Sequence, residues 1–411
     1  MKNANRWIGV MVGGLVLSAA TSAFAQNWPQ WRGVNRDAKV TGFTAPETWP
    51  RELRPTWRVT VGAGDSTPAL VGDKLYVFGR QGADEVVLCL NAADGKEVWR
   101  HAYPSAVISG PSSRVHPGPR SSPAVGDGKV VVIGVNGNLL CLDAAKGNEA
   151  WKNEEFKSVP QFYAASSPMI VDGTVVAELG GKGDGAVLAF DIATGKVKWK
   201  WAGEAPMYSS PALMTVGGVT QVVALTEKSL VGLALADGKL LWQVPFDPSG
   251  GRMAYNAATP IVDKDTVYIT GSGRGTKAVK VEKQGDGFAA KELWSNPEVA
   301  VQFNTPVLKD GMLFGLTERG NLFCVNTQDG KTAWLDKTAH GRGFAAIVDA
   351  GSVLLALPST SELIVYKPDG KEFAQIANIK VSDKETYASP LVAGDRIFVR
   401  DQDVLILYSA K

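Results

Sequence analysis

The amino-acid sequence predicts an all-β protein, an eight-bladed β-propeller whose blades are four-stranded antiparallel sheets. The first observation behind this prediction is a repeated phrase, Leu-Asn-Ala-Ala-Asp-Gly-Lys-Glu-Val-Trp at residues 90–99. Its further copies are residues 142–151, 190–199, 233–242 and 325–334, a weaker copy ending at Trp294, and residues 367–373 with Phe373 in the Trp place. Short strands repeated in this way are typical of a propeller.

The second observation is a Ser/Thr-Pro pair before each copy of the phrase. The pairs are Thr67-Pro68, Ser122-Pro123, Ser167-Pro168, Ser210-Pro211, Thr259-Pro260, Thr305-Pro306 and Ser389-Pro390, with Ala345-Ala346 as a degenerate member. With Ala346 standing in for proline, the steps between successive prolines are 55, 45, 43, 49, 46, 40 and 44 residues. A period in this range indicates that each repeat is one blade rather than one domain.

Within a repeat, apolar runs separated by turn residues predict four strands. In the first repeat we expect strands at residues 68–71, 74–78, 86–90 and 97–100, with tight turns at Gly72-Asp73 and at residues 93–96. The repeated Trp is expected to fill the space between two neighbouring blades, because a large flat indole suits that interface. The Asp-Gly of each phrase supplies the positive-φ turn.

The blade count also predicts how the ring closes. Eight Ser/Thr-Pro-like openings occur, but only seven Trp-type strands follow them, and the last blade ends near Tyr408 after three strands. Residues 55–59, around Trp57, look like the end of the repeated phrase placed before the first blade. We therefore expect this N-terminal strand to complete the last blade, which also hides the sheet edges.

Residues 1–25 are predicted to be a secretory signal peptide. Lys2 and Arg6 give a positive start, an apolar stretch follows, and Ala23-Phe24-Ala25 fits a cleavage site. Residues 26–411 then form a single propeller domain, located in the periplasm or secreted. Gln26 follows the cleavage site where a lipid anchor would require Cys, and no long apolar run predicts a transmembrane segment.

Composition excludes several classes of function. Without the two charges of the signal peptide, 41 basic residues face 41 acidic ones, and no basic stripe indicates nucleic acid or an anionic membrane surface. Cys89, Cys141 and Cys324 share one repeat position, so we expect buried free thiols on separate blades. With three His residues and no metal-ligand spacing, neither a metal nor a cofactor is predicted.

The repeat resembles a known family. Its form Ala-x-Asp-x-x-Thr-Gly-Lys-x-x-Trp, plainest at residues 189–199, is similar to the pyrroloquinoline-quinone-like (PQQ-like) propeller repeats. Residues 27–33, Asn-Trp-Pro-Gln-Trp-Arg-Gly, resemble the start of many bacterial members. The superfamily contains quinoprotein dehydrogenases and the outer-membrane assembly lipoprotein of the Bam complex. The resemblance covers nearly the whole mature chain and implies an eight-bladed ring, whereas the repeated residues say little about function.

The expected topology places a candidate binding site at one mouth of the central channel. Residues just before each Ser/Thr-Pro lie on one face, vary between blades, and are rich in Tyr, Arg and Asn, which recur in binding surfaces. The candidates are Asp65, Arg120, Tyr163, Tyr208, Tyr255, Asn256, Asn304, Arg342 and Tyr387. The alternative is a polar mouth without a ligand. The long insertion at residues 101–120, which includes His101 and His116, is either functional or a loop that packs over the mouth.

Two functions remain open. No catalytic signature appears, which favours an exported, monomeric, non-catalytic scaffold that binds an envelope protein, a peptide or a saccharide on one face. The alternative, implied by the resemblance, is a quinoprotein dehydrogenase that oxidises an alcohol or sugar with PQQ and calcium. The chain lacks the adjacent cysteines of those enzymes, although Asp65, Asn256 and Asn304 could supply oxygen ligands. The absence of a lipid-anchor Cys stands against a direct role as the Bam lipoprotein.

Overall fold

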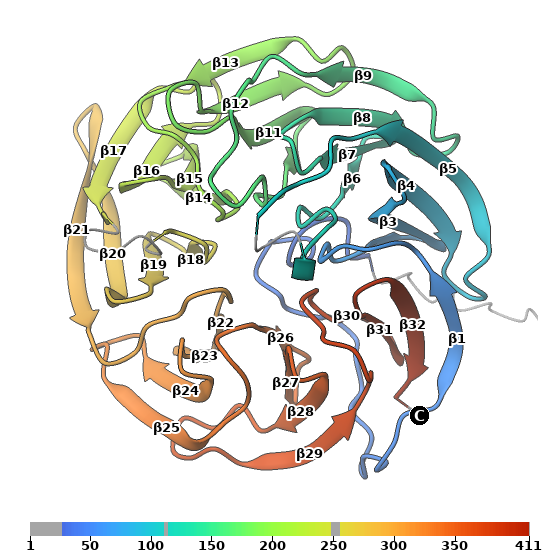
Figure 1. Cartoon of the computed structure of the whole chain (residues 1–411). Helices are drawn as coiled ribbons and strands as arrows, with labels where there is room; N and C mark the ends of the chain where they lie inside the picture. The colour runs from blue at the N-terminus through green and yellow to red at the C-terminus, as the bar shows by residue number, and fades with distance from the viewer. Residues whose placement is uncertain (1–26, 111–113, 248–254, 411) are drawn as a thin grey trace, which may run out of the picture.

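The structure is a ring of eight four-stranded antiparallel sheets, which confirms the predicted propeller (Figure 1). The computed structural model describes residues 27–110, 114–247 and 255–410. The predicted signal peptide, residues 1–25, lies outside the described residues. Each blade runs from an inner strand at the channel to an outer strand at the rim, and in blades one to seven this is the chain order that the hairpins predict.

The first four blades contain sixteen strands in sequence order. Blade one is β2 (Ala69–Val71), β3 (Lys74–Gln81), β4 (Asp84–Asn91) and β5 (Glu97–Pro104). Blade two is β6 (Ala124–Gly126), β7 (Lys129–Ile133), β8 (Leu139–Asp143) and β9 (Glu149–Asn153). Blade three is β10 (Met169–Val171), β11 (Thr174–Leu179), β12 (Ala186–Asp191) and β13 (Val197–Trp201). Blade four is β14 (Ala212–Val216), β15 (Val219–Leu225), β16 (Ser229–Ala234) and β17 (Leu240–Pro245).

The remaining blades follow the same plan. Blade five is β18 (Ile261–Asp263), β19 (Thr266–Gly271), β20 (Gly275–Gln284) and β21 (Gly287–Asn296). Blade six is β22 (Val307–Lys309), β23 (Met312–Leu316), β24 (Asn321–Asn326) and β25 (Thr332–Ala339). Blade seven is β26 (Ala345–Asp349), β27 (Leu354–Pro358), β28 (Glu362–Tyr366) and β29 (Gln375–Lys380). Blade eight joins β30 (Leu391–Ala393), β31 (Arg396–Arg400) and β32 (Val404–Ser409) to β1 (Pro55–Thr60).

The N-terminal strand closes the ring as the sequence predicts. β1 pairs antiparallel with β32, and Trp57 lies opposite Leu407. The insertion after blade one is shorter than expected, however, because residues 101–104 continue β5 and pair with β4. His101 is thus a strand residue, and the described parts of the loop that connects β5 to β6 are residues 105–110 and 114–123. The three cysteines are buried and free, as predicted.

The repeated Trp residues join neighbouring blades by a hydrogen bond as well as by packing. The indole N–H of Trp199 on blade three donates to the carbonyl of Leu235 on blade four at 2.8 Å. Gly238 of that next hairpin has φ +72°, and a Cβ there would lie 2.6 Å from the indole. The same bond joins Trp57 to Ala92, Trp99 to Ala144, Trp151 to Ile192, Trp294 to Thr327 and Trp334 to Asp369. Trp242 instead donates to Gln221 of its own blade.

A second set of contacts joins the blades at the channel, and we call it the hydroxyl ring. In it the backbone N–H of one Ser or Thr donates to the side-chain oxygen of the next blade's Ser or Thr. Each residue in the following series donates its N–H to the side-chain oxygen of the next, at 2.9–3.4 Å: Ser389, Thr67, Ser122, Ser167, Ser210, Thr259 and Thr305. The repeated Ser/Thr-Pro pair therefore does more than open a strand.

Blade seven departs from both patterns. It carries Ala345 where the other blades have the ring hydroxyl. In blade one the third-strand residue just before the bulge, Cys89, pairs with Trp99. In blade seven the corresponding residue, Val365, pairs with Ala377, so Ala377 takes the place of Trp.

The expectation that Phe373 takes the Trp place is wrong: Phe373 precedes β29, and its ring lies 5.7 Å from that of Trp334. The hairpin of blade seven is two residues longer than that of blade one, because Tyr366 pairs with Gln375 where Leu90 pairs with Glu97, so Phe373 falls in the turn before the strand.

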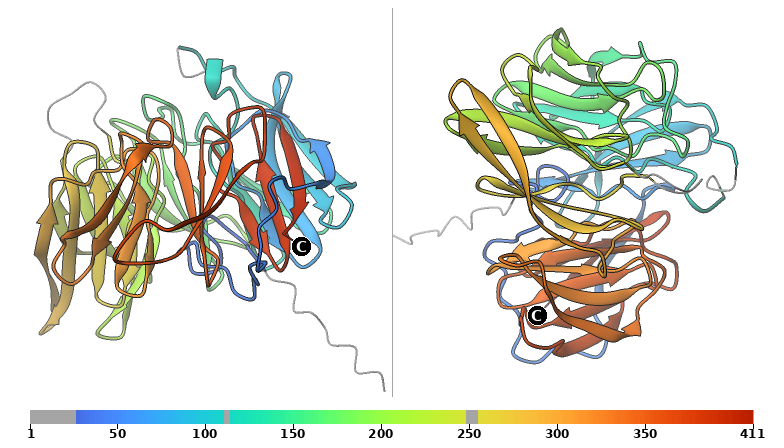
Figure 2. Two further views of the ribbon diagram at one scale, coloured as in Figure 1. Left: turned by 90° about the horizontal axis from the view of Figure 1, so that it is seen from below. Right: turned by 90° about the vertical axis from the view of Figure 1, so that its left-hand side faces the viewer.

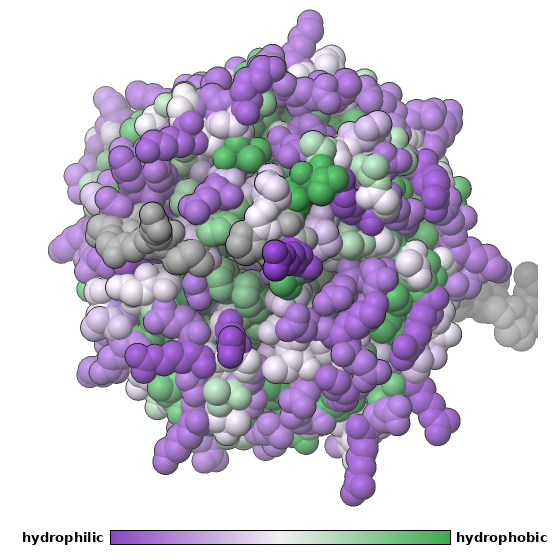
Figure 3. Space-filling model, viewed as in Figure 1, coloured by the Kyte–Doolittle hydropathy of each residue, from purple (hydrophilic) through white to green (hydrophobic). Residues whose placement is uncertain are grey.

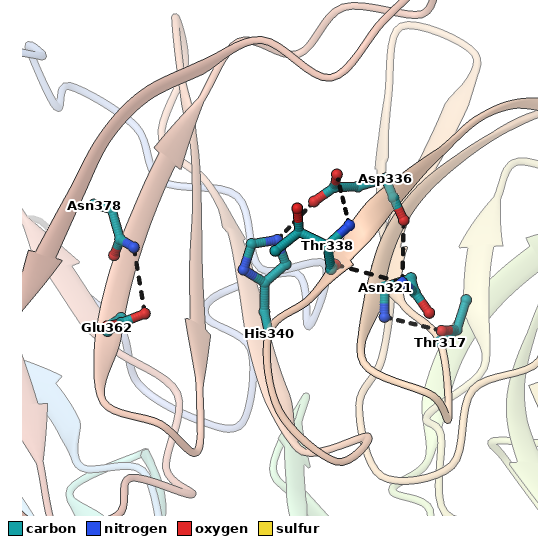
Figure 4. A network of polar contacts seen from close by, with 7 residues as sticks. All are labelled: Thr317, Asn321, Asp336, Thr338, His340, Glu362 and Asn378. Carbon is teal, nitrogen blue, oxygen red and sulfur yellow. Dashed lines mark hydrogen bonds and ion pairs between the residues drawn. The ribbon is translucent and has the colours of Figure 1, made fainter.

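The outer strand of blade six ends in a polar network, shown in Figure 4. His340 Nε2 lies 2.7 Å from a carboxylate oxygen of Asp336, and both side chains are about nine-tenths buried. Asn321 on β24 donates to the backbone carbonyl of Asp336 at 3.1 Å. The third His of the chain thus fixes the end of β25 and does not reach the channel mouth.

The segment before β1 blocks the channel on one face of the ring. Figure 2 shows this N-terminal segment, in dark blue, on the face opposite the teal loop that follows blade one. We call residues 27–40 the N-terminal plug. Its contacts run around the ring, through Trp28 with Leu70, Pro29 with Val125, Gln30 with Ile170, Trp31 with Thr259, Arg32 with Thr305, and Val40 with Asp349. The plug therefore touches six of the eight blades.

Two arginines of the plug carry their charges into the interior. Arg32 Nη1 donates to Thr305 O at 2.9 Å, and Arg36 Nη1 donates to Pro168 O at 3.0 Å. Burial lowers the pKa of Arg32 to about 10 and that of Arg36 to about 9. Glu178 on β11 is 3% exposed, and burial raises its pKa to about 8, against the opposing charge of Arg36.

Replacing one blade-joining indole should destabilise the whole ring. Trp199→Ala removes a buried aromatic side chain and its bond to Leu235, and we expect the free energy of unfolding to fall by about 3–5 kcal/mol. Urea unfolding followed by circular dichroism measures this loss. Val197→Ala, at a 46% exposed position of the same strand, serves as the control and should change stability by less than about 0.5 kcal/mol.

The buried carboxyl of Glu178 should make stability depend on pH. Its folded pKa of about 8 lies above its unfolded value, so the stability that the neutral carboxyl contributes is complete below the unfolded pKa. That stability is lost as the pH rises through about 8. Glu178→Gln should therefore raise the melting temperature at pH 9 and change it little at pH 5. The exposed Glu149→Gln is the control, and equal responses of the two variants would contradict the prediction.

Candidate functional site

The face opposite the entry of the plug has a cavity of about 310 Å³ at the channel axis. In Figure 3, which looks onto the same face as Figure 1, hydrophilic residues dominate the rim while hydrophobic and neutral residues gather near the centre. The cavity is lined by Trp31, Asp65, His116, Arg120, Phe162, Ala165, Ser167, Tyr208, Ser210, Tyr255, Ala257, Thr259, Phe303, Phe344 and Tyr387. Trp31 belongs to the plug, so the cavity is closed where the channel would continue.

Aromatic rings surround most of this cavity, and we call them the aromatic belt. Its members are Phe162, Tyr208, Tyr255, Phe303, Phe344, Tyr387 and His116. Successive centroids lie 4.0–6.1 Å apart, and Phe303 and Phe344 stack with only 9° between their planes. Such contacts between rings stabilise the belt beyond simple burial.

The blade plan explains why these rings meet. Tyr208, Phe303 and Tyr387 each lie two residues before a Ser/Thr-Pro pair, where the chain enters an inner strand. All the inner strands begin on the same face of the ring, so residues at this point converge on the axis (Figure 1). The segment that enters each blade thus contributes at least one residue to the cavity wall.

The charged part of the wall lies near blades one and two. His116 Nδ1 lies 2.6 Å from a carboxylate oxygen of Asp65, and both side chains are mostly buried. Arg120 donates to the carbonyls of Phe162 and His116, and burial lowers its pKa. The His116 ring also contacts Tyr387, with centroids 4.5 Å apart. The loop after blade one therefore packs over the mouth and also supplies part of the cavity wall.

Members of the hydroxyl ring form the deeper part of the cavity. Ser167, Ser210 and Thr259 line it, and their oxygens accept the N–H groups of the preceding blades. Trp31 Nε1 donates to Thr259 Oγ1 at 3.0 Å. The inter-blade contact and the cavity floor thus use the same hydroxyl groups.

The structure brings five of the nine predicted site residues into the cavity: Asp65, Arg120, Tyr208, Tyr255 and Tyr387. The other four lie outside it, which corrects their expected placement. Asn256 and Asn304 are buried and donate to the carbonyls of Thr226 and Leu316, both at 2.7 Å. Their amides satisfy backbone groups inside the blade loops and are turned away from the channel.

Tyr163 and Arg342 lie outside the cavity for other reasons. The hydroxyl of Tyr163 accepts the N–H of Ser109 at 2.7 Å, so this side chain holds the connecting loop. Arg342 is exposed to solvent. The repeat spacing does not indicate Phe162, which lies five residues before Ser167 where Tyr208 lies two before Ser210. It does not indicate Trp31 either, because that residue comes from outside the repeats.

The donor groups at the mouth do not fit the PQQ and calcium site that the family resemblance raises. Asp65 is the one carboxylate among the described lining residues, and it is paired with His116. The amides of Asn256 and Asn304, the other candidate oxygen ligands, are directed to backbone groups. Calcium takes six to eight oxygen ligands. Within the described chain no cluster of three or more His, Cys, Asp or Glu side chains could hold a metal ion.

Comparison with known families agrees with the repeat pattern. The family described as outer membrane protein assembly factor BamB matches residues 52–114 and 83–336, which together span more than half of the chain. The chain belongs to this family of PQQ-like repeat propellers. Across the described ranges no helix is long and apolar enough to cross a membrane.

Individual relatives and solved structures extend this comparison. The outer membrane protein assembly factor BamB of Burkholderia pseudomallei is 24% identical over 363 residues, 86% of each chain. Quinohemoprotein alcohol dehydrogenase ADH IIB of Pseudomonas putida is 31% identical over 118 residues, which cover 28% of this chain and 17% of that enzyme.

Two crystal structures share the fold at 14% sequence identity. BamB from Moraxella catarrhalis superposes with a TM-score of 0.67 over 87% of this chain and 99% of that one. The quinohemoprotein alcohol dehydrogenase from Comamonas testosteroni gives 0.70 over 95% of this chain and 81% of that one. The BamB relatives thus match this propeller over most of its sequence, whereas the sequence match to the ADH IIB enzyme is confined to a short part.

The contact between Tyr163 and the connecting loop should be detectable by hydrogen exchange. Tyr163→Phe removes the acceptor of the Ser109 N–H, and we expect faster exchange of that amide and its neighbours, by about threefold or more. Tyr387→Phe is the matched control, because its hydroxyl donates to Glu385 and does not bond to the loop. Unchanged exchange at Ser109 in Tyr163→Phe would contradict the assignment.

Proposed function

We propose that this protein is an exported, non-catalytic β-propeller that binds a partner protein in the cell envelope and serves the assembly of outer membrane proteins. The observation that carries the proposal is the central cavity, walled by aromatic rings and closed behind by the plug. Aromatic and Arg side chains with a polar end are enriched where proteins bind one another. The partner would engage the face shown in Figure 3.

Family membership supports the assembly role. The matching family is described as an outer membrane protein assembly factor, and the Burkholderia pseudomallei relative carries the same name over 86% of each chain. Residues 1–25, with their signal-peptide pattern, support export to the periplasm, and the mature domain would then be residues 26–411. The near-neutral mature chain offers no basic surface for a nucleic acid or an anionic membrane, and we propose that the protein acts as a monomer.

The dehydrogenase alternative receives less support. The donor set at the mouth does not suit a calcium ion held with PQQ, because Asp65 is engaged and the two amides point elsewhere. The sequence similarity to the ADH IIB enzyme covers 28% of this chain. We therefore propose no resident cofactor and no oxidation reaction.

Site-specific photo-crosslinking in a Gram-negative host tests the proposed function. A benzophenone side chain replaces Phe303 in the belt, or Val98, which is 47% exposed on an outer strand, as the control. We expect the Phe303 position to yield crosslinks to outer membrane precursors or assembly components, identified by mass spectrometry. Products that are absent at Phe303, or equal at both positions, would overturn the proposal.

A set of substitutions tests the same face. Replacing Arg120, Tyr208 and Tyr387 by Ala removes three cavity-lining side chains and should abolish the crosslinks formed from Phe303. The control variant replaces Tyr163 by Phe and Arg342 by Ala, which lie outside the cavity, and should retain them. Melting temperatures of both variants show whether each one is folded. Crosslinks that persist in a folded triple variant would place the binding surface elsewhere.

A further inference from the structure

The shape of the central cavity limits what can enter it. Trp31 lines its base, and the plug contacts six blades beneath it, so a polypeptide cannot thread through the ring. A volume of about 310 Å³ is at the small end for a ligand pocket, whose usual range begins near 300 Å³. The cavity therefore accepts one small group, such as a side chain, a chain end or a small molecule.

The floor of the cavity offers hydrogen-bond donors. The oxygens of Ser167, Ser210 and Thr259 already accept backbone N–H groups of the hydroxyl ring. Each hydroxyl still has its own hydrogen to donate, and the part of the chain that the structure describes gives none of the three an acceptor. Leaving a buried donor without a partner costs free energy, so the floor is suited to a ligand atom that only accepts.

The charges around the floor are predominantly positive. Arg32 and Arg36 lie beneath it, fully buried, and their close contacts are to backbone carbonyls and the amide oxygen of Gln30. One of these contacts runs directly to the floor, because Arg36 Nη2 donates to the carbonyl of Ser167 at 3.2 Å. Neither arginine forms an ion pair within the described residues. Such charges act strongly in a medium of low dielectric constant.

The nearby acids offset only part of this positive charge. Asp37, which attracts Arg32, is partly exposed to solvent. Asp65 is engaged with His116, while Arg120 adds a third cation in the cavity wall. Glu178 is buried near Arg36, and a pKa raised to about 8 by burial keeps its carboxyl largely neutral at pH 7. The floor therefore combines hydroxyl donors with a positive potential, which together favour an anionic acceptor.

The aromatic belt defines the other half of the ligand. Six Phe and Tyr rings and His116 surround the space above the hydroxyls, and flat apolar groups gain most from such walls. We propose that the cavity binds an aromatic carboxylate, with its carboxylate on the hydroxyls of Ser167, Ser210 and Thr259 and its ring inside the belt. This inference rests on the proposed function, because it names the group of the partner that enters the cavity.

Calorimetric titration of the mature chain, residues 26–411, with small probes tests the inference. N-acetyl-L-phenylalanine carries both the ring and the carboxylate, and we expect saturable binding. N-acetyl-L-phenylalaninamide, which lacks the charge, and N-acetylglycine, which lacks the ring, should each bind at least about tenfold more weakly. Equal affinity for the acid and its amide, or no binding of the acid, would overturn the proposal.

Two serines of the hydroxyl ring offer a matched pair of variants. Ser210→Ala and Ser122→Ala both remove a hydroxyl that accepts an inter-blade N–H, at 2.9 Å and 3.0 Å. Only Ser210 lines the cavity. We expect weaker binding of N-acetyl-L-phenylalanine, by about fivefold or more, in Ser210→Ala, and parental affinity in Ser122→Ala. An equal loss in both variants would reduce the role of Ser210 to ring stability and contradict the inference.

The source of the carboxylate is distinguished by a further titration. A hexapeptide ending in Phe with a free carboxyl group that binds more tightly than N-acetyl-L-phenylalanine identifies a chain terminus as the ligand. A peptide that binds more weakly identifies a free acid, and both results support the shared chemistry. Because these probes require no envelope partner, their failure overturns the ligand class alone, whereas failure of the crosslinking experiment overturns the proposed function.

Discussion

The packing of one blade's indole on the next blade's hairpin is the contact on which this molecule depends. A four-stranded sheet alone leaves both of its faces exposed, so each blade is stable only against its neighbours. Trp199 fills that space, bonds to Leu235 and lies against Gly238, whose positive φ and missing side chain allow the close approach. At the channel, the hydroxyl ring makes a second link. Neighbouring blades are therefore joined both near the outer strands, by the indoles, and at the channel, by the hydroxyl ring.

The same geometry creates the cavity. Inner strands that all begin on one face bring one variable residue per blade to the axis, and the belt forms from those residues. Because the plug closes the opposite end, the convergence gives a cavity that is closed at its base instead of a pore. Tyr208 faces the cavity and Ser210 joins two blades, so residues with these different roles lie only a few positions apart in sequence.

The sequence was sufficient for the fold and for part of the site. The spacing of the phrase gave eight blades and the closing role of Trp57, because each repeat carries its own turn and strand signals. The same spacing placed Arg120, Tyr208 and Tyr387 at the cavity. The spacing could not show that the amides of Asn256 and Asn304 donate to backbone carbonyls within the blade loops, because this depends on which carbonyls those loops leave unpaired. Trp31 reaches the cavity by a path outside the repeats, which periodicity does not encode.

The pairing of β1 with β32 has a consequence for biogenesis. Val59 lies opposite Leu405, so the first strand of the ring meets its partner only after nearly the whole chain is available. The N-terminal strand is made first and must wait without its native partner while the later blades follow. Contacts of such long sequence separation form slowly. A chain interrupted before residue 404 would keep an open sheet edge, which proteases and holdase chaperones could recognise as an unfinished product.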